Sequence, residues 1–360
     1  HIYPQYGGYL AGHVQCSGET GTTAYQGGAL STAAQRSTGS EQGGRSMDSA
    51  SDIIRRIFGD QADSLGSEIA EETTRYQALH MVTFPKPAST RRIAVANQKG
   101  GVGKTTTTVN LAAALADSGA RVLVLDMDPQ GNASTALGAH HISGEPSIYD
   151  VIEGRTTIRE AIQQCPSFDH MDVVPASIDL SGAELEIADL GDRTDLLKHA
   201  LDEYLESCEE PYDYVFVDCP PSLGLLVINA MCAVTEVLIP IQAEYYALEG
   251  LGQLINTIGL VQEHYNPVLL VSTMLVTMFD KRTILSRQVY DEVKSHYPNI
   301  VLDTTIPRSV KISEAPSFQQ TVIAYDPHGM GAIAYGEAAL EIARRSPAVL
   351  ATLEAKRGEH

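Results

Sequence analysis

From residue 91 onward, short apolar runs rich in β-branched residues alternate with longer stretches in which apolar residues recur at helical spacing. Strands that are apolar throughout are buried on both faces, so this alternation is typical of a parallel sheet covered by helices. Strands are predicted near 93–97, 121–126, 171–174, 213–218, 235–240, 268–275 and 300–306. Helices are predicted notably at 104–117, 194–206, 245–264, 284–296 and 329–345. The sequence therefore predicts a doubly wound, mostly parallel α/β fold, with its ligand at the carboxyl ends of the strands.

The N-terminal part of the chain lacks this pattern. Residues 1–50 are rich in Gly, Ser, Thr and Gln and show no sustained periodicity, which is typical of a disordered segment. Residues 52–58 have the spacing of a short amphipathic helix. We therefore divide the chain into a low-complexity, disordered extension over 1–85, an α/β domain over 86–347 and a C-terminal tail over 348–360.

Composition limits the classes of function. The chain has 360 residues, 43% of them apolar, which is enough for a sizeable core. It has no apolar run of the roughly 20 residues that span a bilayer, so we expect a cytoplasmic protein. Its five cysteines form no C-x-x-C pair, which favours neither a disulfide framework nor a zinc site. The net charge of −20 means that any contact with DNA must be a local basic patch.

A glycine-rich loop lies between the first predicted strand and the first predicted helix of the domain. Gly100, Gly101 and Gly103 allow a tight turn whose backbone N–H groups point at phosphate oxygens, and the helix adds its positive N-terminal end. Lys104 can reach the β- and γ-phosphates of a nucleotide, and the hydroxyl of Thr105 can hold a magnesium ion. The loop therefore predicts a nucleotide-binding site.

The loop departs from the usual P-loop pattern at its start. The first glycine of that pattern is replaced by Gln98, and Lys99 opens the loop as K-G-G-V-G-K-T. This sequence resembles the deviant Walker A motif of the ParA/MinD/nitrogenase-iron-protein class of P-loop ATPases. The resemblance implies ATP and Mg²⁺ as cofactors, and implies that Lys99 contacts phosphate across a dimer interface. The predicted nucleotide-binding residues of the loop are Lys99, Gly100, Gly101, Val102, Gly103, Lys104, Thr105 and Thr106.

Two other predicted strands end in carboxylates. The stretch 125-LDMDPQGNAST-135 brings Asp126 and Asp128 to the edge where the loop lies, and Asp128 is the candidate to orient a water for attack on the γ-phosphate. The stretch 214-YVFVDCPPSLG-224 ends a buried strand with Asp218, which can hold magnesium through water. These segments resemble the switch I and switch II regions of ParA proteins.

Two later segments, 277–283 and 306–318, resemble the base-contacting and DNA-contacting region of the same family. By that resemblance Met278 and Pro307 flank the adenine, and Ser309 occupies a position where the family often has Asn. Arg282 and Lys311 match basic positions that ParA relatives use for nonspecific DNA.

Residues 91–347 together resemble the chromosomal ParA/Soj type. The resemblance implies a partition protein that hydrolyses ATP, forms an ATP-dependent sandwich homodimer, binds DNA nonspecifically and is stimulated by a ParB-like, centromere-bound partner. It also implies a cytoplasmic, nucleoid-associated protein that segregates chromosome or plasmid DNA.

Three alternatives stay open. A MinD-like positioning ATPase that acts on a membrane or another cargo would need an amphipathic basic helix, and the tail 347–360 has few bulky apolar residues. An iron–sulfur electron donor would need paired cysteines. A nonenzymatic nucleotide-gated scaffold would not need Asp128 and Lys99. We therefore expect neither a membrane partner nor an iron–sulfur cluster.

Overall fold

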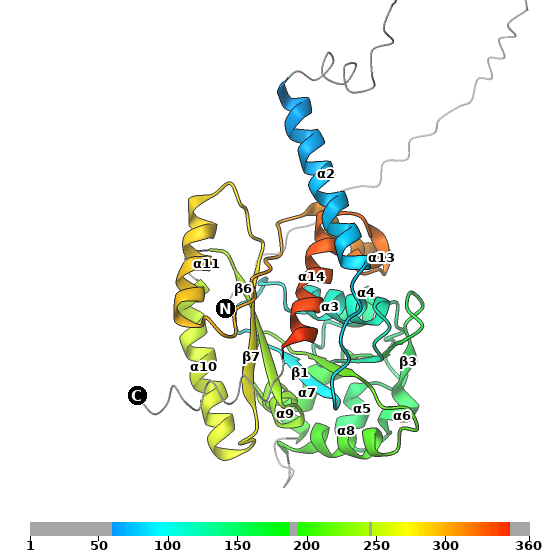
Figure 1. Ribbon diagram of the computed structural model, residues 1–360. Coiled ribbons are helices and arrows are strands. Elements are labelled where there is room, and N and C mark those ends of the chain that lie inside the picture. Colours follow the sequence, from blue (N-terminus) through cyan, green and yellow to red (C-terminus); the bar gives the residue numbers. More distant parts are fainter. Residues whose placement is uncertain (1–59, 188–192, 245–246, 346–360) are drawn as a thin grey trace, which may run out of the picture. The chain divides into compact units, whose positions relative to one another are not determined.

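The computed structural model describes residues 60–187, 193–244 and 247–345, which all belong to one compact unit, Phe58–His360. A seven-stranded sheet in the order β3-β4-β2-β5-β1-β6-β7 forms its centre (Figure 1). The strands are β1 (Arg91–Val95), β2 (Val122–Asp126), β3 (Gln163–Gln164), β4 (Met171–Val174), β5 (Tyr214–Asp218), β6 (Glu236–Gln242) and β7 (Leu270–Thr277). Every pairing is parallel except that of β3 with β4. The predicted mostly parallel α/β fold is confirmed.

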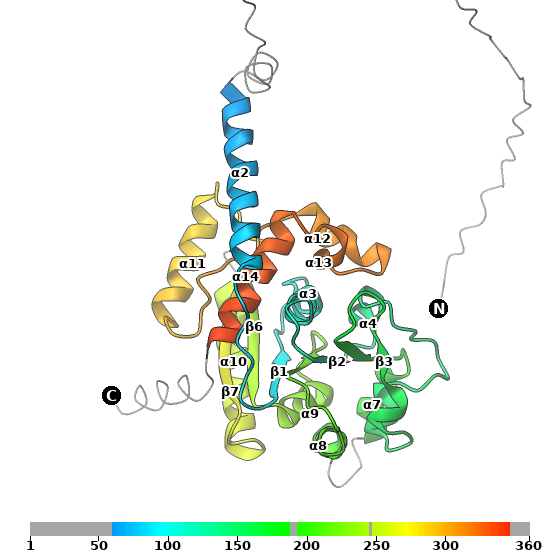
Figure 2. The same cartoon turned by 45° about the vertical axis from the view of Figure 1, so that its right-hand side comes forward.

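Helices cover both faces of this sheet, as Figure 2 shows with α3, α4 and α14 on one side and α7, α8 and α9 on the other. The longer helices are α2 (Asp60–His80), α3 (Lys104–Asp117), α8 (Leu196–Glu206), α9 (Leu225–Ala233), α10 (Ala247–His264), α11 (Ile284–His296) and α14 (Met330–Arg344). The shorter ones are α4 (Asn132–Ala136), α5 (Ile148–Ile152), α6 (Ile158–Ala161), α7 (Leu180–Glu186), α12 (Val310–Glu314), the 3₁₀ helix η2 (Ala315–Phe318) and α13 (Val322–Tyr325).

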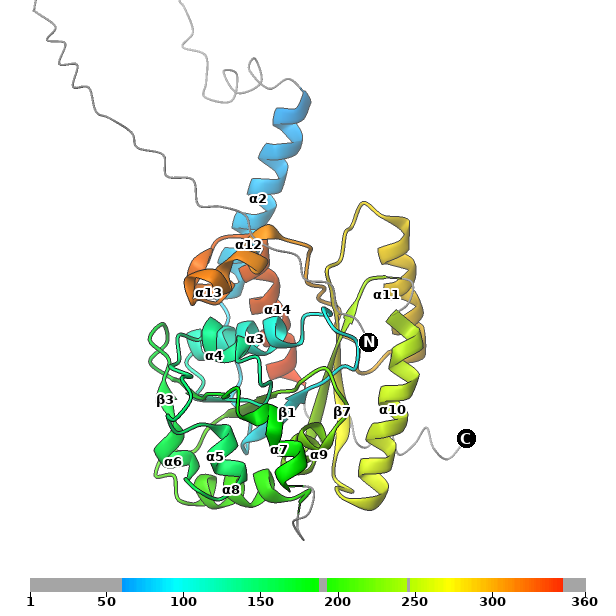
Figure 3. The same cartoon turned by 180° about the vertical axis from the view of Figure 1, so that it is seen from behind.

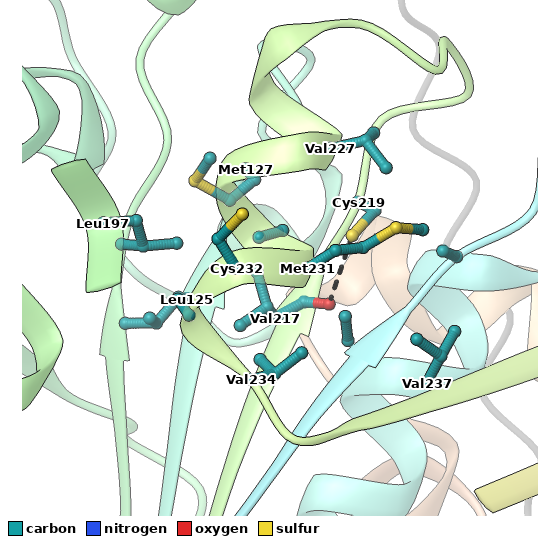
Figure 4. Packing of buried hydrophobic residues seen from close by; sticks show 14 of the residues in the cluster. Leu125, Met127, Leu197, Val217, Cys219, Val227, Met231, Cys232, Val234 and Val237 are labelled. Carbon is teal, nitrogen blue, oxygen red and sulfur yellow. Dashed lines mark hydrogen bonds between the residues drawn. The ribbon is translucent and has the colours of Figure 1, made fainter. Parts of the chain in front are cut away.

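The strands divide their side chains between two cores. In β1, Ala94 faces one hydrophobic cluster, whereas Ile93 and Val95 face the other, because successive side chains of a strand point to opposite faces. Figure 4 shows part of the first cluster, where Val217 of β5 lies among side chains of α9 such as Met231. A strand buried on both faces holds its last residue in place, and this is how β1, β2 and β5 position the residues that follow them.

The predicted strand at 300–306 is wrong. This segment meets β7 through isolated bridges and single hydrogen bonds rather than a continuous ladder. Met274 bridges Val301, and Phe279 bridges Pro307 just after the segment. Between them, the backbone N–H groups of Asp303 and Thr304 donate to the carboxylate of Glu341 in α14, at 2.9 and 3.1 Å. The sheet therefore ends at β7, because a side chain takes the donors that a further strand would have offered to it.

Helix α2 is an element that the sequence analysis did not predict. It lies within the segment 1–85 that we expected to be a disordered extension. It packs on α14, where Arg75 donates to both carboxylate oxygens of Glu337, at 2.9 and 2.5 Å. This contact joins residues far apart in the sequence, so local periodicity gave no sign of it. The expected disordered stretch 1–50, the expected helix at 52–58 and the tail 348–360 lie outside the described residues.

Candidate functional site

The glycine-rich loop lies between β1 and α3, at the carboxyl edge of the sheet. Gly101 and Gly103 have φ of 75° and 89°, in the left-handed region that only glycine adopts readily. The loop is fixed to neighbouring strand ends, because the Thr277 hydroxyl donates to the carbonyl of Val102 at 2.8 Å and the Asn97 amide donates to that of Pro240 at 2.8 Å. The side-chain oxygen of Asn97 also accepts from the backbone N–H of Lys99, at 3.0 Å.

Lys104 places a buried cation inside this loop. Lys104 is only 7% exposed, and its Nζ donates a long hydrogen bond to the carbonyl of Lys99, at 3.4 Å. Burial lowers the pKa of Lys104, while the nearby charge of Asp218 opposes that shift. Within the described residues no carboxylate forms an ion pair with this ammonium. A buried charge without a partner is costly, so the loop is built to receive an anion.

Asp218, the last residue of β5, lies beside the start of α3. Its carboxylate accepts from the hydroxyls of Thr105, at 2.7 Å, and Thr108, at 2.9 Å. Burial, together with the nearby charge of Asp126, raises the pKa of Asp218 to about 8. A magnesium ion favours the charged form of a carboxylate and takes oxygen ligands. The oxygens of Thr105 and Asp218 are therefore of the kind that would take a hard cation such as Mg²⁺.

The two acidic residues at the end of β2 have different environments. Asp126 is fully buried, and its carboxylate accepts from the backbone N–H and the hydroxyl of Ser134, at 2.8 and 2.7 Å. Burial raises the pKa of Asp126 to about 6, although these donors oppose the shift. Asp128 is 8% exposed, and one of its oxygens accepts from the backbone N–H of Gln130 at 3.0 Å. Its second oxygen has no donor within the described residues and is available to a water.

Lys99 has a different partner from Lys104. Its Nζ lies 3.3 Å from the carboxylate of Glu244, just after β6, and both side chains are partly exposed. Gln242 donates to the other oxygen of Glu244 at 2.7 Å. In one protomer Lys99 therefore forms an ion pair within its own chain, rather than joining Lys104 in the loop.

The segments expected to contact a base lie next to each other. Phe279 pairs with Pro307, with a hydrogen bond of 2.9 Å from the N–H of Phe279 to the carbonyl of Ile306. This pairing brings Met278 and Pro307 into neighbouring positions. Met278 has φ of 52°, unusual for a residue other than glycine, and its sulfur accepts from Gln242 at 3.4 Å. Ser309 caps the start of α12 without a hydrogen bond from its side chain to the helix. Their contact with adenine stays a prediction.

The two residues expected to contact DNA lie on the surface, each with an acidic neighbour. Arg282, whose side chain is 85% exposed, donates from Nε to Asp280 at 3.0 Å. Lys311 lies 3.3 Å from Glu314, and its Nζ lies 5.2 Å from the centre of the Tyr325 ring. Their role in DNA binding stays a prediction.

Comparison with known proteins identifies the family. The sequence model of the AAA domain matches residues 90–271. The sporulation initiation inhibitor protein Soj of Bacillus subtilis (strain 168) is 49% identical over 70% of this chain and 97% of that protein. The chromosome partitioning protein ParA of Caulobacter vibrioides (strain NA1000 / CB15N) is 45% identical over 71% of this chain and 94% of that protein. The chain belongs to the ParA/Soj family.

A solved structure shares the fold of this chain. A Mycobacterium smegmatis protein, described as cobyrinic acid a,c-diamide synthase with bound ADP and magnesium, is 39% identical and has a TM-score of 0.59. The similarity covers 69% of this chain and 92% of that one. The resemblance inferred from the loop and switch motifs is therefore confirmed at the level of family and fold.

Several residues of this ParA/Soj site escaped the sequence analysis. Asn97 and Thr277 brace the loop, Thr108 shares Asp218 with Thr105, and Glu244 pairs with Lys99. Thr108 carried a signal, since it lies one helical turn after Lys104 on a helix whose start was predicted. Glu244 and Thr277 carried none, because their partners are more than a hundred residues away.

Two kinds of feature are not found in the part of the chain that the structure describes. Among the described residues, no helix is both long and apolar enough to cross a membrane. Over the same ranges, no group of three or more His, Cys, Asp or Glu side chains could hold a metal ion. A cation at Thr105 and Asp218 would therefore need water or phosphate oxygens for the rest of its ligands.

Proposed function

We propose that this protein is an ATP-hydrolysing partition protein that forms an ATP-dependent sandwich homodimer. In this proposal the dimer binds DNA without sequence preference, and a ParB-like, centromere-bound protein stimulates hydrolysis. The observation that carries it is the buried ammonium of Lys104, without a carboxylate partner among the described residues, in a loop beside Thr105 and Asp218. Such a loop fits a phosphate chain with its magnesium ion.

The residues of the loop suit MgATP in particular. The neighbour at 39% identity was solved with ADP and magnesium, and the same protein was solved with an ATP analogue and magnesium. Lys104 and the backbone N–H groups of the loop would hold the phosphates, and the Thr105 hydroxyl and Asp218 would hold the ion. Met278 and Pro307 would lie against the base. When bound, magnesium would neutralise part of the negative charge on the phosphates.

Hydrolysis would depend on Asp128 and Lys99. The free oxygen of Asp128 can orient a water for in-line attack, while Lys99 adds positive charge from the partner protomer. For this, Lys99 must leave Glu244 and contact the phosphates bound by the other subunit. ATP would then stabilise the dimer because each nucleotide is held by residues of both chains.

The proposed DNA contact is local and depends on dimerisation. With a net charge of −20, the protein as a whole repels phosphate, so Arg282 and Lys311 must form a patch that is strengthened when two chains present it together. Partition relatives at 45–49% identity support a DNA cargo. We accordingly propose a cytoplasmic, nucleoid-associated protein, with MinD-like positioning on another cargo as the alternative.

The decisive experiment measures DNA binding with ATP, ADP or no nucleotide across a salt series. We expect binding with ATP only, weakening steeply as salt rises. Replacing Arg282 and Lys311 together by Glu should weaken this binding and leave ATP binding intact. Binding to anionic lipid vesicles in place of DNA would favour the MinD-like alternative, and an unchanged double variant would show that the patch is elsewhere.

A further inference from the structure

Helix α2 packs at a defined position on the domain, although it precedes residue 90, where the match to the family begins. Besides the double hydrogen bond of Arg75 to Glu337, the ring of Tyr76 lies 4.4 Å from that of His328. Leu79 lies so close to α14 that a Cβ on Gly336 would be 2.4 Å from its side chain. A larger residue at position 336 would therefore require the side chain of Leu79 to move.

The docked helix brings acidic side chains to a basic surface. Glu71 and Glu72 line a cavity of about 260 Å³ together with Lys281, Arg308 and the loop that carries Pro307. Figure 3 shows the lower end of α2 beside α14 and near α12, the helix into which this loop leads. Two acids and two cations from three distant parts of the sequence thus share one cavity.

Lys281 and Arg308 differ from the basic residues next to them. Arg282 and Lys311 each have a carboxylate partner, Asp280 and Glu314. Across the described ranges, neither Lys281 nor Arg308 forms an ion pair, and both residues are exposed. Their charges are therefore not neutralised by an ion pair. The carboxylates of Glu71 and Glu72, which line the same cavity, and that of Asp280, which lies near Arg308, lower the positive potential there.

The packing of α2 on the domain leaves space beside its last turn, and none of its residues whose side chains are described is buried. A cavity of about 590 Å³ lies beneath it, lined by side chains that include Tyr76, His80, Phe84 and Ile333. Residues 81–90, which join α2 to β1, contain neither helix nor strand. Elements with few buried apolar contacts open at low free-energy cost.

We propose that Lys281 and Arg308 form an additional binding site for the phosphate backbone of DNA, and that Glu71 and Glu72 of α2 compete with DNA for it. This proposal rests on the proposed DNA binding. It adds a further contact with DNA and the regulation of that contact by α2. Phosphates bind more strongly when α2 moves away, because the acids then no longer offset the two cations.

The test compares charge-neutral variants of the full chain, bound to a slowly hydrolysed ATP analogue, by anisotropy of labelled duplex DNA of arbitrary sequence. Glu71→Gln with Glu72→Gln should tighten binding roughly threefold to tenfold at low salt, and the gain should fade as salt rises. Glu209→Gln with Glu210→Gln is the matched control. These exposed acids change net charge equally, and they precede β5 at the opposite edge of the sheet.

A third variant identifies the site itself. Lys281→Gln with Arg308→Gln should weaken binding, lower the salt dependence by about two phosphates per subunit, and remove the gain from the Glu71 and Glu72 changes. The proposal is overturned if the control pair tightens binding as much as the α2 pair. It is also overturned if the α2 pair still tightens binding without Lys281 and Arg308. If neither parent nor variants bind DNA at low salt, the proposed function fails, and this site with it.

Discussion

At the scale of single residues, Asp126 and Asp128 show how two carboxylates of one strand end acquire different tasks. Asp126 accepts two hydrogen bonds from Ser134 and one from the N–H of Asp128, at 3.2 Å, so its bonding capacity is used by the fold. Asp128 keeps an oxygen that no described residue bonds. Asp126 therefore holds the residues that follow β2 in place, whereas Asp128 can act on a water.

We expect Asp128→Ala to slow single-turnover ATP cleavage on the order of 10²-fold, with little loss of ATP affinity, because orienting the water matters mainly in the transition state. The control is Asp126→Asn, which should lower the free energy of unfolding while the folded fraction keeps near-parental cleavage. Near-parental cleavage by Asp128→Ala would remove its catalytic assignment.

The pH dependence of stability gives a test of Asp218. Its pKa rises from an ordinary value of 3.8 to about 8 on folding without magnesium. Between these two pKa values the native state retains a proton that the unfolded state releases. The contribution of Asp218 to the free energy of unfolding is therefore full below pH 3.8 and disappears as the pH rises through about 8.

We therefore expect the metal-free parent to lose stability between about pH 5 and about pH 8. Asn cannot ionise, so the stability of Asp218→Asn should depend less on pH and should exceed that of the parent near pH 8. Urea unfolding without nucleotide or magnesium measures this. Equal pH slopes for parent and variant would mean that Asp218 is already charged in the free protein. The variant should also lose magnesium-dependent ATP binding.

At the scale of elements, α14 is the helix on which distant segments meet. Gly336 gives α2 its close approach through Leu79. Gly331 does the same for α12, since a Cβ there would lie 2.7 Å from Ile312. Through these contacts both α12, which carries Lys311, and α2, which carries Glu71, pack on α14. By contrast, nothing lies within 4 Å of a Cβ on Gly259 in α10.

The same substitution should therefore have opposite effects on two helices. Gly259→Ala should stabilise the protein by roughly 0.5–1 kcal/mol, because alanine costs less conformational entropy in a helix. Gly336→Ala should destabilise it, since the methyl group displaces Leu79. Urea unfolding measures both, and Leu79→Ala should offset part of the cost of Gly336→Ala. Equal stabilisation by the two alanines would mean that α2 does not dock as described.

At the scale of the whole molecule, the two lysines of one loop have separate roles. Lys104 points into its own loop, whereas Lys99 pairs with Glu244 at the surface, at 3.3 Å. Exposed ion pairs of this kind contribute about 1 kcal/mol or less. A nucleotide on a second protomer can therefore displace Glu244 from Lys99 at little cost.

We expect ATP, but not ADP, to make the protein dimerise, and Lys99→Ala to prevent this while each monomer still binds ATP. Light scattering with nucleotide measures the mass. Lys86→Ala is the control, because it removes another exposed lysine that also pairs with a carboxylate, Asp213 at 3.1 Å. An ATP-bound dimer of Lys99→Ala would show that Lys99 does not act across the interface.

The sequence by itself determined whatever depends on neighbours along the chain. The predicted bounds of α3 and α11, 104–117 and 284–296, agree with the structure, because the periodicity of a helix is local. The glycine-rich loop could be predicted for the same reason, because Gly101 and Gly103 adopt the positive φ angles that glycine allows. Strands apolar throughout also announced a buried parallel sheet.

Tertiary structure alone decided the features that depend on distant partners. The stretch 300–306 has the composition of a strand, yet Glu341 takes its backbone donors. Helix α2 has no strong apolar stripe, and Arg75 and Leu79 dock it on Glu337 and Gly336. The ion pair of Lys99 with Glu244 joins two loops that follow different strands. Such contacts join segments that are far apart in the sequence, so no local pattern along the chain reveals them.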